Sequence, residues 1–149
     1  MLTVALIEDE KQIRLFVRTA LEAEGIAVFD AETGKQGLIE TATRKPDLVI
    51  VDLGLPDTDG LDVIRELRGW SELPVIVLSA RTREDEKAAA LDAGADDYLT
   101  DQAVRRVGAA RADPRASAPA QTIRRACASA RSRWTWRCAW RCAAAHRCI

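Results

Sequence analysis

Cysteine is absent from the first 100 residues of this 149-residue chain, and all four cysteines come later. That absence excludes a disulfide framework in the first region and fits a cytoplasmic protein. Long apolar runs are also missing. No stretch approaches the roughly 18 uncharged apolar residues that a membrane-spanning helix needs, so we expect no membrane segment. Residues 1–7 lack a basic flank and run directly into three acidic residues, unlike a signal peptide.

Positive charge is scarce in the same region, although the whole chain carries a net charge of only -1. Residues 1–100 contain 11 Lys and Arg against 21 Asp and Glu, whereas residues 101–149 contain 11 Arg, no Lys and 2 Asp. Three of the four tryptophans also lie after residue 100. The composition therefore predicts two regions: an acidic region at 2–100 and a basic tail at 101–149 that is rich in Arg, Ala, Cys and Trp.

Short β-branched runs alternate with helical patterns along the acidic region, which is typical of βα units around a parallel sheet. Apolar residues recur at helical spacing in segments 13–21, 33–42, 61–67 and 84–93, and Gly25 and Gly94 favour helix ends. We expect strands at 4–7, 26–29, 48–51, 74–79 and 97–100. The pattern predicts an α/β fold with five parallel strands covered on both faces, and it shows no fifth helix.

Acidic and hydroxyl side chains follow the strands of this expected sheet. Glu8 and Asp9 come after the first strand, Asp52 comes after the third, and Ser79 ends the fourth. The functional crevice of such sheets lies beyond the carboxyl ends of the strands. We therefore expect three carboxylates and one hydroxyl group to converge on one edge. Tyr98, in the fifth strand, is interpreted either as a packing residue or as a neighbour of this site.

Three clustered carboxylates repel one another, so such a site normally holds a hard cation with oxygen ligands, and Mg²⁺ is the natural candidate. Asp52 can also act as a nucleophile and form an aspartyl phosphate, which Ser79 could hydrogen-bond. A single acidic residue at a strand end is more often a helix cap, but three on one edge favour a function. The segment Asp57-Thr58-Asp59-Gly60 is interpreted as a structural turn and helix start.

Four segments resemble the receiver domain of bacterial two-component response regulators: IEDE (7–10), KPDLVIVDLGLPDTDG (45–60), PVIVLSAR (74–81) and DAGADDYLT (92–100). The resemblance covers residues 2–100 and implies a flavodoxin-like, doubly wound sheet in the strand order 2-1-3-4-5. Several of these segments are similar in sequence to the corresponding segments of winged-helix transcription factors that regulate potassium transport. The implied function is a phosphoacceptor module that takes phosphate from a sensor histidine kinase, without enzymatic activity beyond Mg²⁺-dependent self-phosphorylation.

The resemblance also implies roles for individual residues. Asp52 is the expected phosphoacceptor, and Ser79 and Tyr98 are the expected switch pair. The expected Mg²⁺ ligands are Glu8, Asp9, Asp52 and the backbone carbonyl oxygen of Gly54. The switch repositions the fourth helix, fifth strand and fifth helix, the face through which such regulators dimerise. We expect dimerisation to be weakened here, because this face lacks a recognisable fifth helix, and specific DNA binding to be absent, because the winged-helix domain is missing.

The family pattern departs after Thr100, where relatives continue with Lys-Pro-Phe and this chain continues with Asp101-Gln102-Ala103. The family's lysine pairs with phosphoryl oxygens, so an acidic residue there should cost on the order of several kcal/mol of phosphoryl stabilisation. Residues 102–105 can be encoded CAA GCC GTT CGG, which one base later reads AAG CCG TTC and encodes Lys-Pro-Phe. We interpret residues 101–149 as an out-of-frame, disordered tail and expect slow phosphorylation.

Other interpretations of the tail remain open. Zinc could bind three cysteines and one histidine, although their spacing matches no standard finger: Cys138, Cys142, His146 and Cys148. Arginines interleaved with three tryptophans are typical of segments that bind nucleic acid or membrane surfaces. A tail so rich in arginine would bind polyanions non-specifically. The chain could also be a product without any output.

Overall fold

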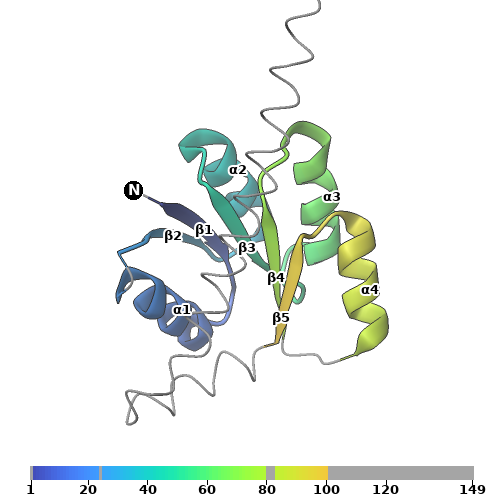
Figure 1. The fold of residues 1–149 in the computed structure, drawn as a ribbon, viewed down its shortest axis with the longest axis horizontal. Helices are drawn as coiled ribbons and strands as arrows, with labels where there is room; N and C mark the ends of the chain where they lie inside the picture. Colours follow the sequence, from blue (N-terminus) through green and yellow to red (C-terminus); the bar gives the residue numbers. More distant parts are fainter. Residues whose placement is uncertain (1, 24, 80–82, 101–149) are drawn as a thin grey trace, which may run out of the picture.

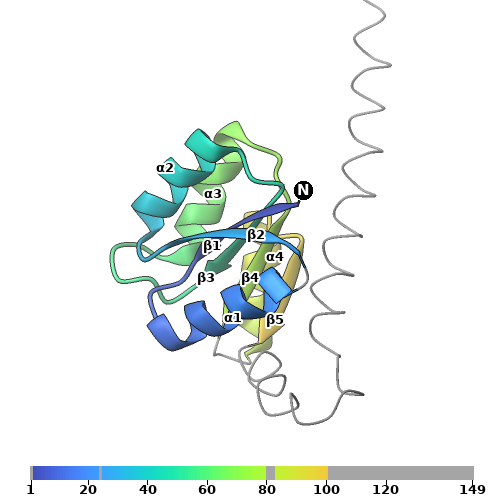
Figure 2. The same cartoon turned by 90° about the vertical axis from the view of Figure 1, so that its left-hand side faces the viewer.

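A parallel sheet with helices on both faces organises the chain (Figures 1 and 2). The computed structural model describes residues 2–23, 25–79 and 83–100. The strands are β1 (Thr3–Ile7), β2 (Ala27–Ala31), β3 (Leu48–Asp52), β4 (Val75–Ser79) and β5 (Asp97–Thr100). They lie in the order β2-β1-β3-β4-β5, and every neighbouring pair is parallel. The expected flavodoxin-like order 2-1-3-4-5 is therefore confirmed.

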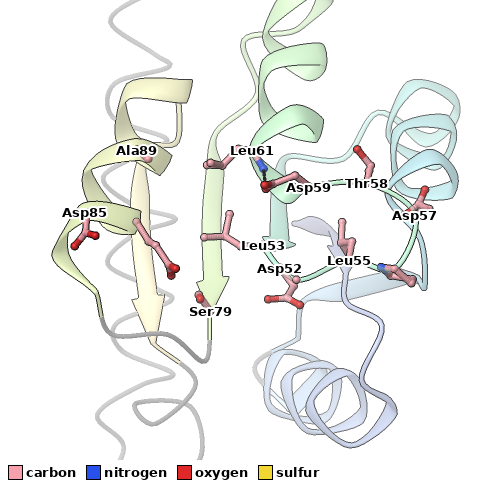
Figure 3. A pocket seen from close by; sticks show the side chains of 13 residues that line it. Asp52, Leu53, Leu55, Asp57, Thr58, Asp59, Leu61, Ser79, Asp85 and Ala89 are labelled. Atoms are coloured by element: carbon pink, nitrogen blue, oxygen red, sulfur yellow. Dashed lines mark hydrogen bonds between the residues drawn. The ribbon is translucent and has the colours of Figure 1, made fainter.

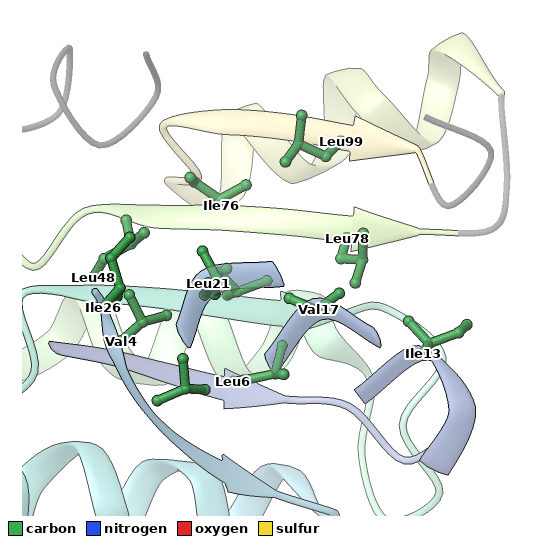
Figure 4. Packing of buried hydrophobic residues seen from close by; sticks show 12 residues of the cluster. Val4, Leu6, Ile13, Val17, Leu21, Ile26, Leu48, Ile76, Leu78 and Leu99 are labelled. Atoms are coloured by element: carbon green, nitrogen blue, oxygen red, sulfur yellow. The ribbon is translucent and has the colours of Figure 1, made fainter. Parts of the chain in front are cut away.

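The described helices divide between the two faces of the sheet, as Figure 2 shows. They are α1 (Lys11–Ala23), α2 (Gly34–Arg44), α3 (Gly60–Trp70) and α4 (Glu84–Ala93). On one face, Ile13, Val17 and Leu21 of α1 pack against strand residues such as Leu6 and Leu78 (Figure 4). Side chains of α2, α3 and α4 pack against the opposite face. Each face therefore has its own hydrophobic core.

Burial explains why three of the strands have continuous apolar sequences. Every residue of β4 is buried, and so are the first four residues of β3 and the last four of β1. Successive side chains of a strand point to opposite faces, so a strand covered on both faces must be apolar throughout. The edge strands β2 and β5 are only partly buried. Their sequences are accordingly less uniform.

Local sequence signals set the ends of several helices. The Thr33 hydroxyl accepts a hydrogen bond from the Gln36 N–H at the start of α2, as a helix N-cap does. Gly94 ends α4 in the left-handed region at φ 114°, and its N–H donates to carbonyl oxygens of the last turn. A side chain would be strained at that φ, which explains why glycine stands there. The expectation that Gly94 ends a helix is confirmed.

The second strand lies where the sequence predicted it, but its bounds are shifted towards the C-terminus. The apolar run predicted a strand at 26–29, but β2 spans Ala27–Ala31. Ile26 precedes the strand and is buried in the core on the α1 face. Asp30 belongs to the strand despite its charge, because two arginine side chains of α1 bind its carboxylate. The apolar run thus located the strand but extended one residue before its start and missed its last two residues.

Several expectations concern residues outside those that the structure describes. They are the disorder of residues 101–149, the missing fifth helix, the effect of Asp101 and the zinc interpretation of Cys138, Cys142, His146 and Cys148. These stay predictions. Within the described ranges, no helix is long and apolar enough to cross a membrane.

Candidate functional site

Three carboxylates meet at the carboxyl edge of the sheet. One oxygen from each of Glu8, Asp9 and Asp52 lies within 4.8 Å of the others. Glu8 and Asp9 follow β1, and Asp52 is the last residue of the neighbouring strand β3. Glu8 is only 2% exposed, Asp52 is half-buried and Asp9 is exposed. The sheet order thus unites residues that are more than 40 positions apart in the sequence.

Glu8 is the most buried of the three acidic residues, so its carboxyl group is the one for which a negative charge is least favourable. Burial, together with the neighbouring negative charge of Asp52, raises its pKa to about 8, although a hydrogen bond from the Glu10 N–H acts in the opposite direction. Loss of water around a carboxylate disfavours the ionised form, and a second carboxylate close by has the same effect. A cation bound between the three oxygens would remove that penalty.

Hydrogen bonds to several elements hold the loop after β1 in place. The N–H of Glu8 donates to the carbonyl oxygen of Ala31 at 3.0 Å, and a carboxylate oxygen of Glu8 accepts from the N–H of Glu10 at 3.0 Å. Arg14 of α1 donates through Nη1 to the carbonyl oxygen of Glu8 at 2.9 Å. Sequence reasoning did not identify Arg14, because nothing in the local pattern marks this contact.

The loop between β3 and α3 passes close to Asp52. A Cβ atom at Gly54 would lie 3.5 Å from an Asp52 carboxylate oxygen, so the Gly54 backbone is next to the carboxylate. A Cβ atom at Gly60 would collide with the backbone of Asp52 and Leu53. The Gly60 N–H also donates to the carbonyl oxygen of Leu53 at 3.2 Å. Helix α3 can therefore begin directly against the end of β3 only because residue 60 has no side chain.

Two aspartates of this loop are structural. The Asp59 carboxylate accepts from the Leu61 N–H at 2.9 Å and caps α3. The Asp57 carboxylate accepts from the N–H groups of Gly34 and Lys35 at the start of α2, at 2.8 and 3.0 Å. These backbone hydrogen bonds lower the pKa of Asp57. The structural interpretation of segment 57–60 agrees with these contacts, but the bridge from Asp57 to α2 has no signal in the sequence.

Two cavities open at this edge. The smaller, of about 350 Å³, is lined by Glu8, Asp9, Asp52, Gly54 and Ser79 among others. The larger, of about 660 Å³, shares the last three of these residues and extends between the β3–α3 loop and α4. Figure 3 shows the side chains of Asp52 and Ser79 at the ends of adjacent strands, facing this space. The structure thus brings together five of the six expected site residues.

Tyr98 is the exception. It pairs with Val77 in the sheet, two positions before the pair of Ser79 and Thr100. Its half-buried side chain packs against the core on the face of α2, α3 and α4. Tyr98 lines neither of the two cavities. Its surroundings in the described structure are those of a packing residue next to α4.

The donor set fits a small, hard cation. Carboxylate and carbonyl oxygens are the ligands that Mg²⁺ takes in proteins, and Mg²⁺ usually keeps several waters and binds phosphate oxygens as well. The three carboxylate oxygens are close enough to share one ion. An adjacent cavity leaves room for a phosphoryl group beside Asp52. The arrangement can therefore hold a cation and bring an anionic group to a carboxylate nucleophile.

Comparisons with known proteins agree with this geometry. A family model of the response regulator receiver domain matches residues 4–107. The KDP operon transcriptional regulatory protein KdpE of Escherichia coli K12 is 65% identical over 100 residues, which are 67% of this chain and 44% of that protein. The chain therefore spans less than half the length of this curated relative.

Solved structures resemble the chain at lower identity. The Francisella response regulator 1452 receiver domain superposes with a TM-score of 0.64 at 33% identity, covering 73% of this chain and 95% of that one. The BeF3-activated N-terminal receiver domain of Klebsiella pneumoniae RstA gives a TM-score of 0.67 at 27% identity, covering 74% and 94%. Both likenesses extend over nearly the whole of the solved domain.

Proposed function

Because the chain belongs to the family of response regulator receiver domains, we propose that it is the phosphoacceptor module of a two-component phosphorelay. In this proposal Asp52 takes a phosphoryl group from a phosphohistidine of a sensor histidine kinase. One observation carries the proposal: the convergence of Glu8, Asp9 and Asp52 within 4.8 Å at the carboxyl edge of the sheet. In doubly wound sheets this edge is where ligands bind.

The transfer is a nucleophilic substitution at phosphorus. A carboxylate oxygen of Asp52 attacks, an O–P bond forms, the N–P bond of the donor imidazole breaks, and the departing imidazole nitrogen takes up a proton. The ligands proposed for Mg²⁺ are Glu8, Asp9, Asp52 and the carbonyl oxygen of Gly54. When bound, Mg²⁺ would neutralise these carboxylates and the incoming phosphoryl oxygens. The Ser79 hydroxyl is proposed to donate to the attached phosphoryl group, with Tyr98 as the second member of the switch pair.

Acetyl phosphate tests the assignment without a kinase. The chain, incubated with acetyl phosphate and Mg²⁺, should gain the mass of one phosphoryl group, and chelation of Mg²⁺ should prevent the gain. Asp52→Asn should abolish labelling, whereas Asp62→Asn, which changes an exposed acid of α3, should not. Labelling of Asp52→Asn at the native rate would refute the assignment. We expect the native rate itself to be slow, because Asp101 stands where the family has a lysine.

The wider role is also a proposal, because the chain spans 44% of the relative's length. The name of that relative places it at the KDP operon, and we propose that this chain derives from a cytoplasmic regulator of potassium transport. The described region forms a receiver fold only, so residues 2–100 by themselves should bind no specific DNA sequence. Dimerisation through the face of α4 and β5 should be weak, since the fifth helix of the family is not recognisable in the sequence.

The charge of residues 101–149 favours a second candidate function, non-specific binding of polyanions. These residues contain 11 Arg and 2 Asp. Binding through released counterions weakens steeply as salt increases. Retention on DNA should therefore fall with salt and disappear when residues 101–149 are deleted, while Asp52→Asn leaves it unchanged. If Asp52→Asn abolished retention on DNA and deletion of residues 101–149 did not, this candidate function would be excluded.

A further inference from the structure

Arg14 links helix α1 to the loop that carries two of the three clustered carboxylates. Its Nη1 donates to the backbone carbonyl oxygen of Glu8 at 2.9 Å. The Arg14 side chain is only 11% exposed, so little water competes for this hydrogen bond. The bonded carbonyl belongs to the peptide group that joins Glu8 to Asp9. The contact therefore acts on the piece of backbone from which both carboxylates project.

The guanidinium group is itself anchored at the end of β2. Its Nε lies 3.1 Å from a carboxylate oxygen of Asp30, and its Nη2 lies 2.7 Å from a carboxylate oxygen of Glu32. All three of its nitrogens thus have a partner. A guanidinium group is planar and presents its donors in a fixed geometry, so two anchored nitrogens also fix the direction of the third. Arg14 therefore presents a preorganised donor to Glu8.

The end of β2 consequently holds the Glu8 backbone in two ways. Ala31, the last residue of β2, accepts from the N–H of Glu8 at 3.0 Å. Arg14, oriented by Asp30 and Glu32, binds the carbonyl oxygen of the same residue. Repulsion among the three carboxylates tends to spread them apart when no cation lies between them. These contacts restrain the loop against that spreading.

We propose that Arg14 is a positioning residue of the divalent-cation site, holding the Glu8–Asp9 peptide so that both carboxylates face Asp52. This inference rests on the proposed function, because it concerns the same metal site. Contacts that orient ligands from outside the coordination shell commonly change metal affinity by about 10- to 100-fold. Removing the Arg14 donor should therefore weaken Mg²⁺ binding without removing any ligand.

Arg18 provides the matched control. It lies one turn further along α1 and binds the same Asp30 through Nη1 at 2.6 Å, but its other partner is Glu22 of its own helix. Both arginines thus join α1 to β2, whereas the Glu8 carbonyl contact belongs to Arg14. A purely structural role would make the two substitutions equivalent. A positioning role would separate them.

The experiment is calorimetric titration of the full chain with Mg²⁺, together with acetyl phosphate labelling at increasing Mg²⁺ concentration. Arg14→Gln should weaken Mg²⁺ binding by about 10-fold. Its labelling rate at saturating Mg²⁺ should stay within about twofold of native, since the lost contact orients ligands and does not touch phosphorus. Arg18→Gln should leave the Mg²⁺ affinity unchanged.

Three results would overturn the proposal: native Mg²⁺ affinity in Arg14→Gln, equal weakening in both variants, or no Mg²⁺ binding by the native chain. If circular dichroism shows that Arg14→Gln is unfolded, Glu32→Gln decides instead. The Glu32 side chain is 67% exposed, and its loss frees one anchor of Arg14. That variant should bind Mg²⁺ about two- to threefold more weakly, and unchanged affinity would refute the role of Arg14. A native chain that binds Mg²⁺ but is never labelled would refute only the proposed phosphotransfer.

Discussion

Helices α3 and α4 border the larger cavity from opposite sides, but the protein holds them very differently. Helix α3 buries Val63, Ile64 and Leu67 and begins at Asp59 with a side-chain cap. Helix α4 buries only Ala90 and begins at Arg83 without a side-chain cap hydrogen bond. Segments with few buried apolar contacts open at a lower cost in free energy. The α3 wall of the cavity is therefore the firm one, and the α4 wall is the one that can yield.

The firm attachment of α4 lies at its far end. Arg68 of α3 donates through Nε to the carbonyl oxygen of Gly94 at 2.9 Å and forms an ion pair with Asp96 at 3.0 Å. The Asp96 carboxylate also accepts from the Val75 N–H at 3.0 Å. Among the described residues, these contacts fix α4 to α3 and β4 where it ends, whereas its start beside Ser79 has no side-chain cap.

The largest expected difference is between substitutions of a large apolar side chain in each of the two helices. Ile64 of α3 is fully buried and Leu91 of α4 is 44% exposed. Ile64→Ala should lower the free energy of unfolding by about 2–5 kcal/mol, because it removes buried methyl groups and leaves a cavity. Leu91→Ala should lower it by less than about 1 kcal/mol. Urea denaturation measures both, and equal losses would show that α4 is held as firmly as α3.

The positions of the strands were predictable because burial on both faces leaves a strong local signal. Runs such as 48–51 and 75–78 have no polar residue, and each proved to be a buried strand. The end of strand β2 was missed because its charged residue, Asp30, is stabilised by arginines of α1 that no local pattern connects with it. Apolar patterning locates the sheet but does not report ion pairs between distant segments.

The candidate site divides in the same way. Glu8, Asp9, Asp52 and Ser79 could be placed on one edge because each follows a recognisable strand. The contacts of Arg14 and Asp57 could not be foreseen, because their partners lie in elements distant in sequence: Glu32 is 18 residues from Arg14, and Gly34 is 23 residues from Asp57. For Tyr98 the sequence left two interpretations open, a packing residue or a neighbour of the site, and in the described structure it packs against the core and lines neither cavity.

The next largest effect should be a dependence of stability on pH, and it comes from Glu8 in the loop after β1. The pKa of Glu8 is raised from 4.5 to about 8, chiefly by burial. The folded chain therefore binds this proton more tightly than the unfolded chain, so stability present below pH 4.5 is lost as pH rises towards 8. Each pKa unit corresponds to about 1.4 kcal/mol. The metal-free chain should lose a few kcal/mol of unfolding free energy across this window.

Glu8→Gln is the control for this pH dependence, because glutamine has nearly the same shape and does not ionise. Urea denaturation between pH 5.5 and 8.5 should give a nearly flat profile for this variant. That range also lies above the titration of Asp57, whose pKa is lowered. Saturating Mg²⁺ should flatten the profile of the native chain by stabilising the ionised carboxylate. A native profile that matches Glu8→Gln without metal would contradict the raised pKa.

The smallest expected effects test the helix starts directly. Asp59→Ala removes the cap of α3 and should cost about 1 kcal/mol, whereas Arg83→Ser supplies α4 with a capping hydroxyl and should stabilise it by about 0.5 kcal/mol. The ion pair that serine would remove, from Arg83 to Asp85, joins two side chains more than 70% exposed and should contribute little. Amide hydrogen exchange resolves the two helices. Arg83→Ser should slow amide hydrogen exchange in the first turn of α4 and leave the exchange rates in α3 unchanged. The new cap would act only on the first turn of α4, beside Ser79. Unchanged exchange there would show that other contacts already hold this end of the helix, and the two helices would then not differ in how firmly they are held.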